Sequence, residues 1–429
     1  MIRRPCLPST LLSQSGERCE ISSQGQSELV ANNGFQSSFY PIVEALYKGK
    51  PLETLFTTRN EQYHSQLLRG AANAYSMKSL TDLETQVQPV IDLFLNKLEE
   101  FGARGTKPVD AGNWVQYFTF DALGAINFST QFGFLQTGTD VGDNMKTIDG
   151  LIAYLSIIGQ APWLHKVLLG NPVVQKILPL ENYNEIQNFA IRMIERRTRG
   201  EQPDAGYDLL ARLLEVAASE PTEKEGEAKT KQPPLTHAQI IALTTTNILA
   251  GSATTACGLR SIFYHLCRNP SALKKLQTEV DEAFSSGALS TPSPRYAEAA
   301  KLPYLDAVVV EGLRMHPATG FVLEREVPAG GAVICGEKIP EGTVVGINAW
   351  VMHANKQVFG EDAETFRPER WLEDGEERIK VMKRCNMTVR LSLSPFFFFL
   401  QTEMRLMIFL VRRRPPHLRR TQHLHDGNR

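Results

Sequence analysis

The sequence predicts a mainly α-helical protein with a small β part, and three features indicate this class. Residues 237–268 are apolar on nearly every side apart from some threonines and an asparagine, as expected of a helix buried in the middle of a large protein. Several other segments carry apolar residues at helical spacing. Residues 322–348 differ, because glycines and prolines separate short β-rich runs in a pattern typical of hairpins.

The helices before the long central segment follow from their apolar spacing. Residues 80–101 predict an amphipathic helix with a polar face, and residues 114–128 predict a buried one. Residues 217–234 are charged, rich in Pro and Gly and nearly free of large apolar groups, so they predict a solvated loop. Further helices are expected at 147–160 and 182–198.

The central helix has recognisable start and stop signals. Thr236 is the expected N-cap, and Gln239 three residues later would complete a capping box. Asn269-Pro270 ends the helix, and its threonines and glycine argue against a bilayer span. Amphipathic helices are expected after it at 271–285 and 303–315.

Composition excludes several classes of protein. The chain has 429 residues, 42% of them hydrophobic, and a formal net charge of -1, which gives no electrostatic case for binding nucleic acid. Its six cysteines are scattered without a CxxC pair, which favours neither a disulfide framework nor a zinc site. We expect no secretory signal and no ordinary transmembrane helix, because no clean apolar run of about 20 residues occurs.

The segment AGSATT at 250–255 lies in the middle of the central helix. Glycine lowers helix stability by about 1 kcal/mol relative to alanine, and threonine hydroxyls can bond to carbonyls one turn earlier. Together they permit a local widening of the kind found at functional sites, where a threonine hydroxyl could face a ligand. A core helix that uses small residues for close packing would explain the same segment.

Two further motifs carry paired charges. Glu311 and Arg314 lie three residues apart on one face of an otherwise apolar helix. Such pairs are usually solvated and contribute little, but a half-buried pair would need further partners. In FRPERW at 366–371, Pro368 fixes a non-helical loop and Arg370 can bind a carboxylate with its forked guanidinium. A plain surface loop with an aromatic anchor is the alternative for this motif.

In their order and spacing, AGxxTT, then ExxR about 57 residues later, then FRPERW resemble the motifs of the cytochrome P450 family. Upstream, 55–77 resembles the B–C helix region of fungal members and 114–135 resembles the E helix. The resemblance implies an incomplete P450 fold that lacks the N-terminal anchor and strands, the haem-binding loop and the following helix. The implied division is an irregular segment at 1–30, a P450-like domain at 31–388 and a divergent tail at 389–429.

The resemblance also implies roles for individual residues. A buried structural network would support the haem pocket, and cationic or N–H donors would bind the haem propionates through charge-assisted bonds. The network residues are Glu311, Arg314 and Arg370, and the propionate donors are His64, Arg69 and Arg325. The catalytic groove on the central helix would consist of Ala250, Gly251, Thr254 and Thr255, and the substrate-lining segment of Ala318, Thr319, Phe321 and Val322.

Two departures from the family pattern affect this pocket. Ala253 stands where the family usually has Asp or Glu, which relays protons together with the following threonine. The relay would then depend on Thr254 with water or Ser252. Leu68 stands where relatives often have Arg, so one propionate contact would be missing.

The largest departure lies at 389–429. Phe396 stands where the axial Cys ligand is expected, and it cannot supply the electron density of a thiolate, so no metal ligand is predicted there. Cys385 lies eleven residues earlier, before the loop. One hypothesis is that the reading leaves the family's coding sequence after Thr388, which comparison of gene and transcript would test. The other is a membrane-surface tether, since an apolar run is followed by an Arg-rich end.

The reaction implied by the resemblance is that of a haem b-dependent monooxygenase. One atom of O2 would enter a small lipophilic substrate, with electrons from NADPH through NADPH-cytochrome P450 reductase. The fungal character of the upstream segments favours secondary metabolism. The family resides at the endoplasmic reticulum membrane, and with no recognisable anchor this chain is expected to be cytoplasmic or peripheral. The alternatives are a catalytically inactive P450-like fragment without the Cys ligand, and an unrelated helical binding protein.

Overall fold

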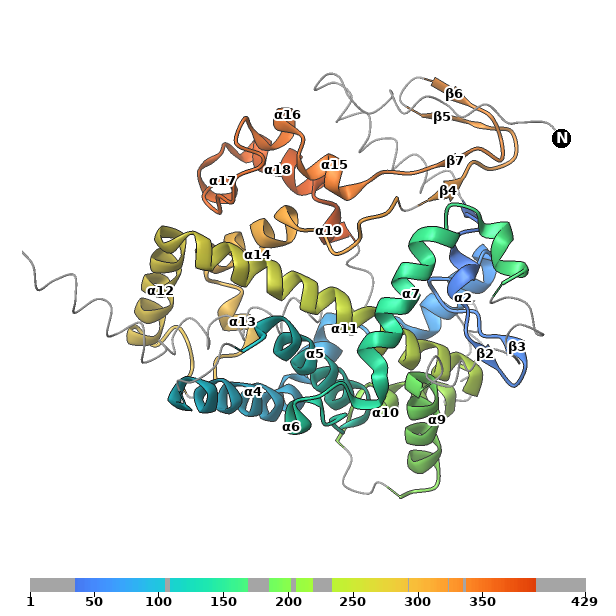
Figure 1. Ribbon diagram of the computed structural model, residues 1–429, viewed down its shortest axis with the longest axis horizontal. Coiled ribbons are helices and arrows are strands. Elements are labelled where there is room, and N and C mark those ends of the chain that lie inside the picture. The colour runs from blue at the N-terminus through green and yellow to red at the C-terminus, as the bar shows by residue number, and fades with distance from the viewer. Residues whose placement is uncertain are drawn as a thin grey trace, which may run out of the picture.

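The structure is a computed structural model that describes residues 35–104, 109–168, 185–201, 206–218, 234–291, 293–322, 324–334 and 337–390. The predicted mainly helical class with a small β part is confirmed (Figure 1). The predicted irregular segment at 1–30 and the divergent tail from 391 onward lie outside the described residues, as does most of the predicted loop at 217–234.

Helix α11 (His237–Arg268) runs through the middle of the molecule (Figure 1). Its predicted start is confirmed, since the Thr236 hydroxyl accepts from the Gln239 N–H and the Gln239 side chain accepts from the Thr236 N–H. Among the described residues, α11 is the one helix long and apolar enough to span a bilayer, and 67% of its most apolar stretch is buried inside the protein.

The first half of the chain packs against the N-terminal part of α11. Helix α5 (Ala111–Phe128) is its main neighbour, and α4 (Glu84–Arg104) lies against α5. A short α3 (Met77–Thr81) precedes α4, so the helix predicted at 80–101 is broken near its start. Helices α2 (Glu61–Ala71), α6 (Phe134–Thr137), α7 (Asn144–Ile158), α9 (Glu185–Thr198) and α10 (Leu209–Ala218) complete this part.

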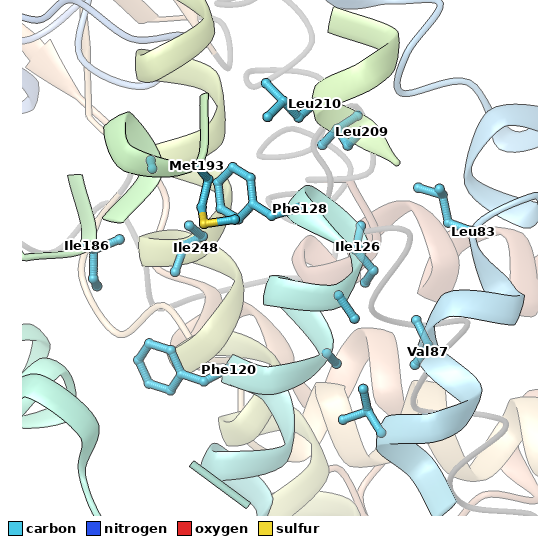
Figure 2. Packing of buried hydrophobic residues seen from close by; sticks show 14 of the residues in the cluster. Leu83, Val87, Phe120, Ile126, Phe128, Ile186, Met193, Leu209, Leu210 and Ile248 are labelled. Carbon is cyan, nitrogen blue, oxygen red and sulfur yellow. The ribbon is translucent and has the colours of Figure 1, made fainter. Parts of the chain in front are cut away.

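The largest hydrophobic core lies among these helices. Figure 2 shows Phe128 of α5 beside Met193 of α9 and Ile248 of α11, with Leu209 and Leu210 of α10 near them. All five side chains are buried because each helix presents an apolar face to α11.

A second core covers the C-terminal part of α11. Helices α12 (Pro270–Ser285) and α14 (Pro303–Met315) pack here, with the single turn α13 (Tyr296–Ala299) between them. Gly312 permits the close approach of α14, because a Cβ at this residue would lie 2.5 Å from Ile262 Cγ1. The Ser261 hydroxyl also donates to the Gly312 carbonyl at 2.7 Å, which joins the two helices directly.

The remaining helices are short and follow one another after the sheet region. They are α15 (Ala349–His353), α16 (Lys356–Phe359), α17 (Arg370–Glu373), α18 (Glu376–Cys385) and α19 (Met387–Arg390). A third core, which includes Phe359, Trp371 and Met382, holds them together.

The β part consists of short antiparallel pairs. Strands β5 (Ala332–Ile334) and β6 (Glu337–Ile339) form a hairpin, as do β2 (Leu46–Tyr47) and β3 (Lys50–Pro51). Strand β4 (Arg325–Glu326) lies between β1 (Phe35–Gln36) and β7 (Val344–Val345). The predicted hairpins at 322–348 are thus confirmed, and one N-terminal strand, β1, does cover an edge of the small sheet.

Candidate functional site

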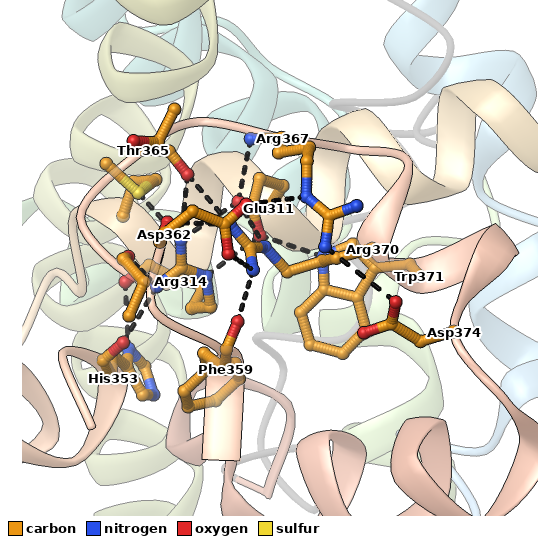
Figure 3. Close-up of polar contacts among 12 residues, drawn as sticks. Glu311, Arg314, His353, Phe359, Asp362, Thr365, Arg367, Arg370, Trp371 and Asp374 are labelled. Atoms are coloured by element: carbon orange, nitrogen blue, oxygen red, sulfur yellow. Dashed lines mark hydrogen bonds and ion pairs between the residues drawn. The ribbon is translucent and has the colours of Figure 1, made fainter. Parts of the chain in front are cut away.

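The carboxylate of Glu311 on α14 lies at the centre of a buried polar network (Figure 3). Its Oε2 accepts from Arg314 Nε at 2.8 Å and from the Trp371 indole N–H at 2.9 Å. Its Oε1 accepts from Arg314 Nη2, Arg370 Nε and the Arg367 main-chain N–H, each at 2.9 Å. The structure therefore brings together the three network residues that the motifs singled out, and it excludes a solvated surface pair.

Every guanidinium nitrogen of Arg314 and Arg370 donates a hydrogen bond. Arg314 Nη1 donates to the carbonyls of His353 and Ala363, both at 2.7 Å. Arg370 donates to the Phe359 carbonyl. It also donates to a carboxylate oxygen and to the main-chain carbonyl of Asp362. Buried ions are tolerated only with such complete bonding.

Electrostatics keeps the Glu311 carboxylate ionised. Burial alone would raise its pKa, but the hydrogen bond from Arg314 and the charges of Arg314 and Arg370 outweigh burial and hold the pKa below its usual range. Asp362 follows the same pattern, because Arg370 and Arg367 lower the pKa of its carboxyl. The network is thus a set of permanent charges, suited to fixing loop positions and unsuited to proton transfer.

One face of α11 is less completely buried than the rest of the helix. Between residues 240 and 259, every side chain that keeps some exposure lies on this face, three or four positions apart: Thr246, Leu249, Ala250, Ala253, Thr254 and Cys257. We call these six residues the open face. Ala250 is its most exposed member, and the Thr254 hydroxyl donates to the Ala250 carbonyl at 2.6 Å.

The structure separates the residues of the predicted catalytic groove. Ala250 and Thr254 lie on the open face, whereas Thr255 and Gly251 are buried. Ser252 is also fully buried, whereas Thr254 keeps some exposure, and the Ser252 carbonyl accepts from the Thr119 hydroxyl of α5. The hydroxyls of Ser252 and Thr255 have no hydrogen-bond partner among the described residues.

The predicted propionate donors come from two elements. His64 and Arg69 lie on α2, and Arg325 lies in β4. Arg59, just before α2, joins these elements, because it donates to the Gln36 carbonyl of β1 and pairs with Glu326 of β4 at 2.8 Å.

Each of these three donors has a different environment. The Arg325 guanidinium is half-buried, lies over the Tyr40 ring and donates to the Tyr40 hydroxyl at 2.5 Å. Arg69 is exposed and donates to the Ser65 carbonyl of its own helix. His64 is half-buried, 3.9 Å from the Glu61 carboxylate, which is too far for a hydrogen bond. Arg325 and His64 are therefore more buried than Arg69.

The predicted substrate-lining segment follows α14. Ala318 and Thr319 are half-buried, and Val322 is 36% exposed. The Phe321 ring lies 5.4 Å from the Phe39 ring and packs against the cluster that includes Leu155 of α7. The segment is therefore positioned beside α7, and only part of it is free to contact a ligand.

Sequence reasoning missed several members of the polar network, among them Asp362, Trp371 and His353. Trp371 was considered only as an aromatic anchor, although its place directly after Arg370 could have suggested a shared partner. His353 is 2% exposed and bonds to main-chain atoms of two other elements, for which the sequence has no signal.

A family model described as Cytochrome P450 matches residues 27–386, most of the chain. The chain belongs to the cytochrome P450 family. The resemblance predicted from the ordered motifs is therefore confirmed, and an unrelated helical protein is excluded.

The curated relatives are fungal cytochrome P450 monooxygenases. One from Aspergillus terreus is 35% identical over 82% of this chain and 70% of its own length. Cytochrome P450 monooxygenase cicH from Emericella nidulans is 36% identical over 82% of this chain and 68% of its own. Cytochrome P450 monooxygenase mpaDE' from Penicillium brevicompactum is 34% identical over 81% of this chain and 40% of its own. The fungal type is thus confirmed.

The P450 family implies haem. Ala250 and Thr254 keep some exposure on the open face, and half-buried Arg325 and His64 have side chains of the kind that bind carboxylates. A P450 haem also needs a sulfur ligand. Cys385 is buried in the third core, no cluster of three metal-ligating side chains occurs among the described residues, and Phe396 lies outside them.

Proposed function

We propose that this P450 takes part in the oxidation of a small lipophilic compound in fungal secondary metabolism. The open face of α11 is the observation that carries the proposal, because a stretch of helix that is otherwise buried keeps exposure at Ala250, Ala253 and Thr254. When bound, haem b supplies the oxygen activation, with electrons from NADPH through NADPH-cytochrome P450 reductase. Association with the endoplasmic reticulum membrane is part of the proposal and rests on family membership.

The residues of the open face would have distinct roles. Ala250, with Gly251 behind it, would leave room for the bound group, and Thr254 would hold a proton donor at its Oγ1. Ala253 cannot replace the usual carboxylic acid, so water would have to bring protons to Thr254. Thr255 is buried on the other side of the helix, and its role would be packing.

The remaining predicted residues would bind the haem propionates, contact the substrate or support the pocket. Arg325 and His64 would hold the propionates, with a weaker contribution from the exposed Arg69. Ala318, Thr319 and Val322 would contact substrate, while Phe321 would fix their position through Phe39. Glu311, Arg314 and Arg370 would keep this scaffold rigid.

The second candidate is a catalytically inactive P450-like protein, and Phe396 favours it. The chain has no cysteine after Cys385, so nothing in its last 44 residues can supply the expected thiolate. This candidate would retain the fold described above without oxidising a substrate.

The two candidate functions predict different carbon monoxide difference spectra. The purified chain is incubated with haemin, reduced and exposed to carbon monoxide, and the difference spectrum is recorded. A thiolate-type Soret band supports the monooxygenase. A haem spectrum without that band, or no retained haem, supports the inactive protein.

A matched pair of variants tests the proposed propionate site independently of turnover. Arg325→Leu should lower haem retention on gel filtration several-fold, because it removes a half-buried cation. Arg192→Leu, at an exposed arginine on α9, should leave retention unchanged. Equal retention in both variants would reject Arg325 as a propionate donor.

A further inference from the structure

His353, the last residue of α15, connects two other elements through its imidazole ring (Figure 3). Its Nδ1 lies 2.9 Å from the Arg314 carbonyl at the end of α14. Its Nε2 accepts from the Met387 main-chain N–H of α19 at 2.9 Å. The ring is therefore a direct link between the Glu311 network and Met387 in the segment that follows Cys385.

Only one form of the imidazole satisfies both bonds. A carbonyl can only accept and a main-chain N–H can only donate, so Nδ1 must carry the proton and Nε2 must be bare. The other neutral tautomer would face the carbonyl with a lone pair and Met387 with an N–H. The protonated ring would also place an N–H against the Met387 N–H, leaving a buried donor without an acceptor.

The surroundings favour this neutral form. The charged groups that act on the ring are Arg314 and Glu311, both on α14. The neighbours from other elements, Phe359 of α16 and Met387 of α19, are uncharged. Burial lowers the pKa of His353 to about 4, and the Arg314 charge acts in the same direction.

We propose that His353 is a positioning residue whose Nδ1–H tautomer fixes the segment after Cys385 to the end of α14. The main chain of His353 also bonds to Arg314, because the His353 carbonyl accepts from Arg314 Nη1 at 2.7 Å. Arg314 thus fixes His353, and His353 fixes Met387. The inference goes beyond the proposed function and does not depend on it, since every contact lies within the polypeptide.

The tautomer can be measured directly. The chain is labelled with ¹⁵N-histidine, and the His353 signals are assigned by their loss in His353→Gln. We expect a protonated Nδ1 and a bare Nε2 at neutral pH, with no change down to about pH 5, about 1.5 units below the ordinary histidine pKa. A protonated Nε2, or titration at the ordinary pKa, would overturn the proposal.

Replacing His353 by Asn or by Gln tests its bonds to the Arg314 carbonyl and to the Met387 N–H separately. The Asn amide of His353→Asn reaches the Nδ1 position and can donate to the Arg314 carbonyl, but it cannot reach Met387. The Gln amide of His353→Gln extends to the Nε2 position, where its oxygen can accept from the Met387 N–H. Hydrogen exchange at the Met387 amide should therefore be at least about tenfold faster in His353→Asn than in His353→Gln.

His316 provides the control, because it ends α14 on the surface and has the same two amide replacements. His316→Asn and His316→Gln should leave exchange at Met387 unchanged. Equal exchange in the two His353 variants would contradict the proposed link. If neither His353 variant folds, the His353 signals are assigned in the unaltered chain by their proximity to the Met387 amide proton, and the tautomer still decides.

Discussion

Arg370 and Trp371 are consecutive residues that bind the two different oxygens of the Glu311 carboxylate. Arg370 Nε donates to Oε1 and the Trp371 indole N–H donates to Oε2, both at 2.9 Å. One turn of chain thereby fixes the orientation of a carboxylate on another helix. Four predictions follow from this network and its neighbours.

Trp371→Phe should destabilise the protein by about 2 kcal/mol, the typical value for a hydrogen bond to a charged group. The substitution keeps an aromatic ring and removes the indole donor to Glu311. Urea unfolding followed by circular dichroism measures the change. Trp350→Phe is the control, since Trp350 is 42% exposed. Equal losses in the two variants would mean that the indole bond contributes nothing specific.

Glu311→Gln should destabilise the protein by about 3–5 kcal/mol, because it leaves Arg314 and Arg370 buried with one negative charge fewer. The same urea titration measures this loss. Glu377→Gln removes the acidic partner of Lys380 in an exposed pair with the same kind of spacing, and should change stability by less than about 0.5 kcal/mol. A similar loss at both sites would argue against a buried network.

Gly312→Ala should destabilise the protein by about 1–3 kcal/mol, because the added Cβ would overlap Ile262 between α14 and α11. Gly150 offers the matched control, since it lies in the interior of α7 with no atom within 4 Å of an added Cβ. Gly150→Ala should stabilise by about 0.5–1 kcal/mol. Thermal unfolding of both variants shows whether each substitution lowers or raises the stability of the protein.

Acid should weaken the fold through His353 before it affects Glu311. The His353 pKa is about 4 in the folded protein and 6.5 ordinarily, so the unfolded chain binds the proton first as pH falls. Stability from this residue is complete above about pH 6.5 and is lost between about 6.5 and 4, by about 3 kcal/mol in total.

Glu311 acts at lower pH, because its folded pKa is lowered and its contribution disappears only as pH falls through that lowered value. Urea midpoints measured across this range separate the two residues. His353→Gln should reduce the pH dependence of stability between about pH 6.5 and 4, without changing the loss at lower pH that is due to Glu311. The rest of the dependence in that range comes from groups such as His165, His265 and His316, whose pKa values burial also lowers. An unchanged slope in that variant would show that other groups account for it.

The sequence predicted much of the fold because its signals are local. The Thr236–Gln239 capping box and the Asn269-Pro270 stop lie within a few residues of the helix ends that they define. The resemblance to the P450 family likewise implied that Glu311, Arg314 and Arg370 belong to one network. The positions of Thr254 and Thr255 were harder to predict, because adjacent residues of a helix point in different directions. Only the spacing of four residues from Ala250 indicates that Thr254 lies on the open face.

Long-range contacts to main-chain atoms could not be predicted in this way. His353 bonds to the Arg314 carbonyl and the Met387 N–H, and every residue type offers the same main-chain groups. Side-chain identity therefore gives no signal at either partner. The covering of the sheet edge by β1 was missed for the same reason, because that pairing uses main-chain bonds of two-residue strands.

Helix α11 belongs to two hydrophobic cores in succession. Its buried apolar residues up to Leu259 contribute to the core shared with α5 and α9, and those from Ile262 onward to the core shared with α12 and α14, while the partly buried Phe263 packs against both. A chimera of this chain with a relative should therefore be joined between Leu259 and Ile262. The buried apolar side chains of α11 would then keep the core partners of their own parent. The contacts that cross the junction, such as Arg59 with Glu326 and Phe39 with Phe321, would have to suit both parents.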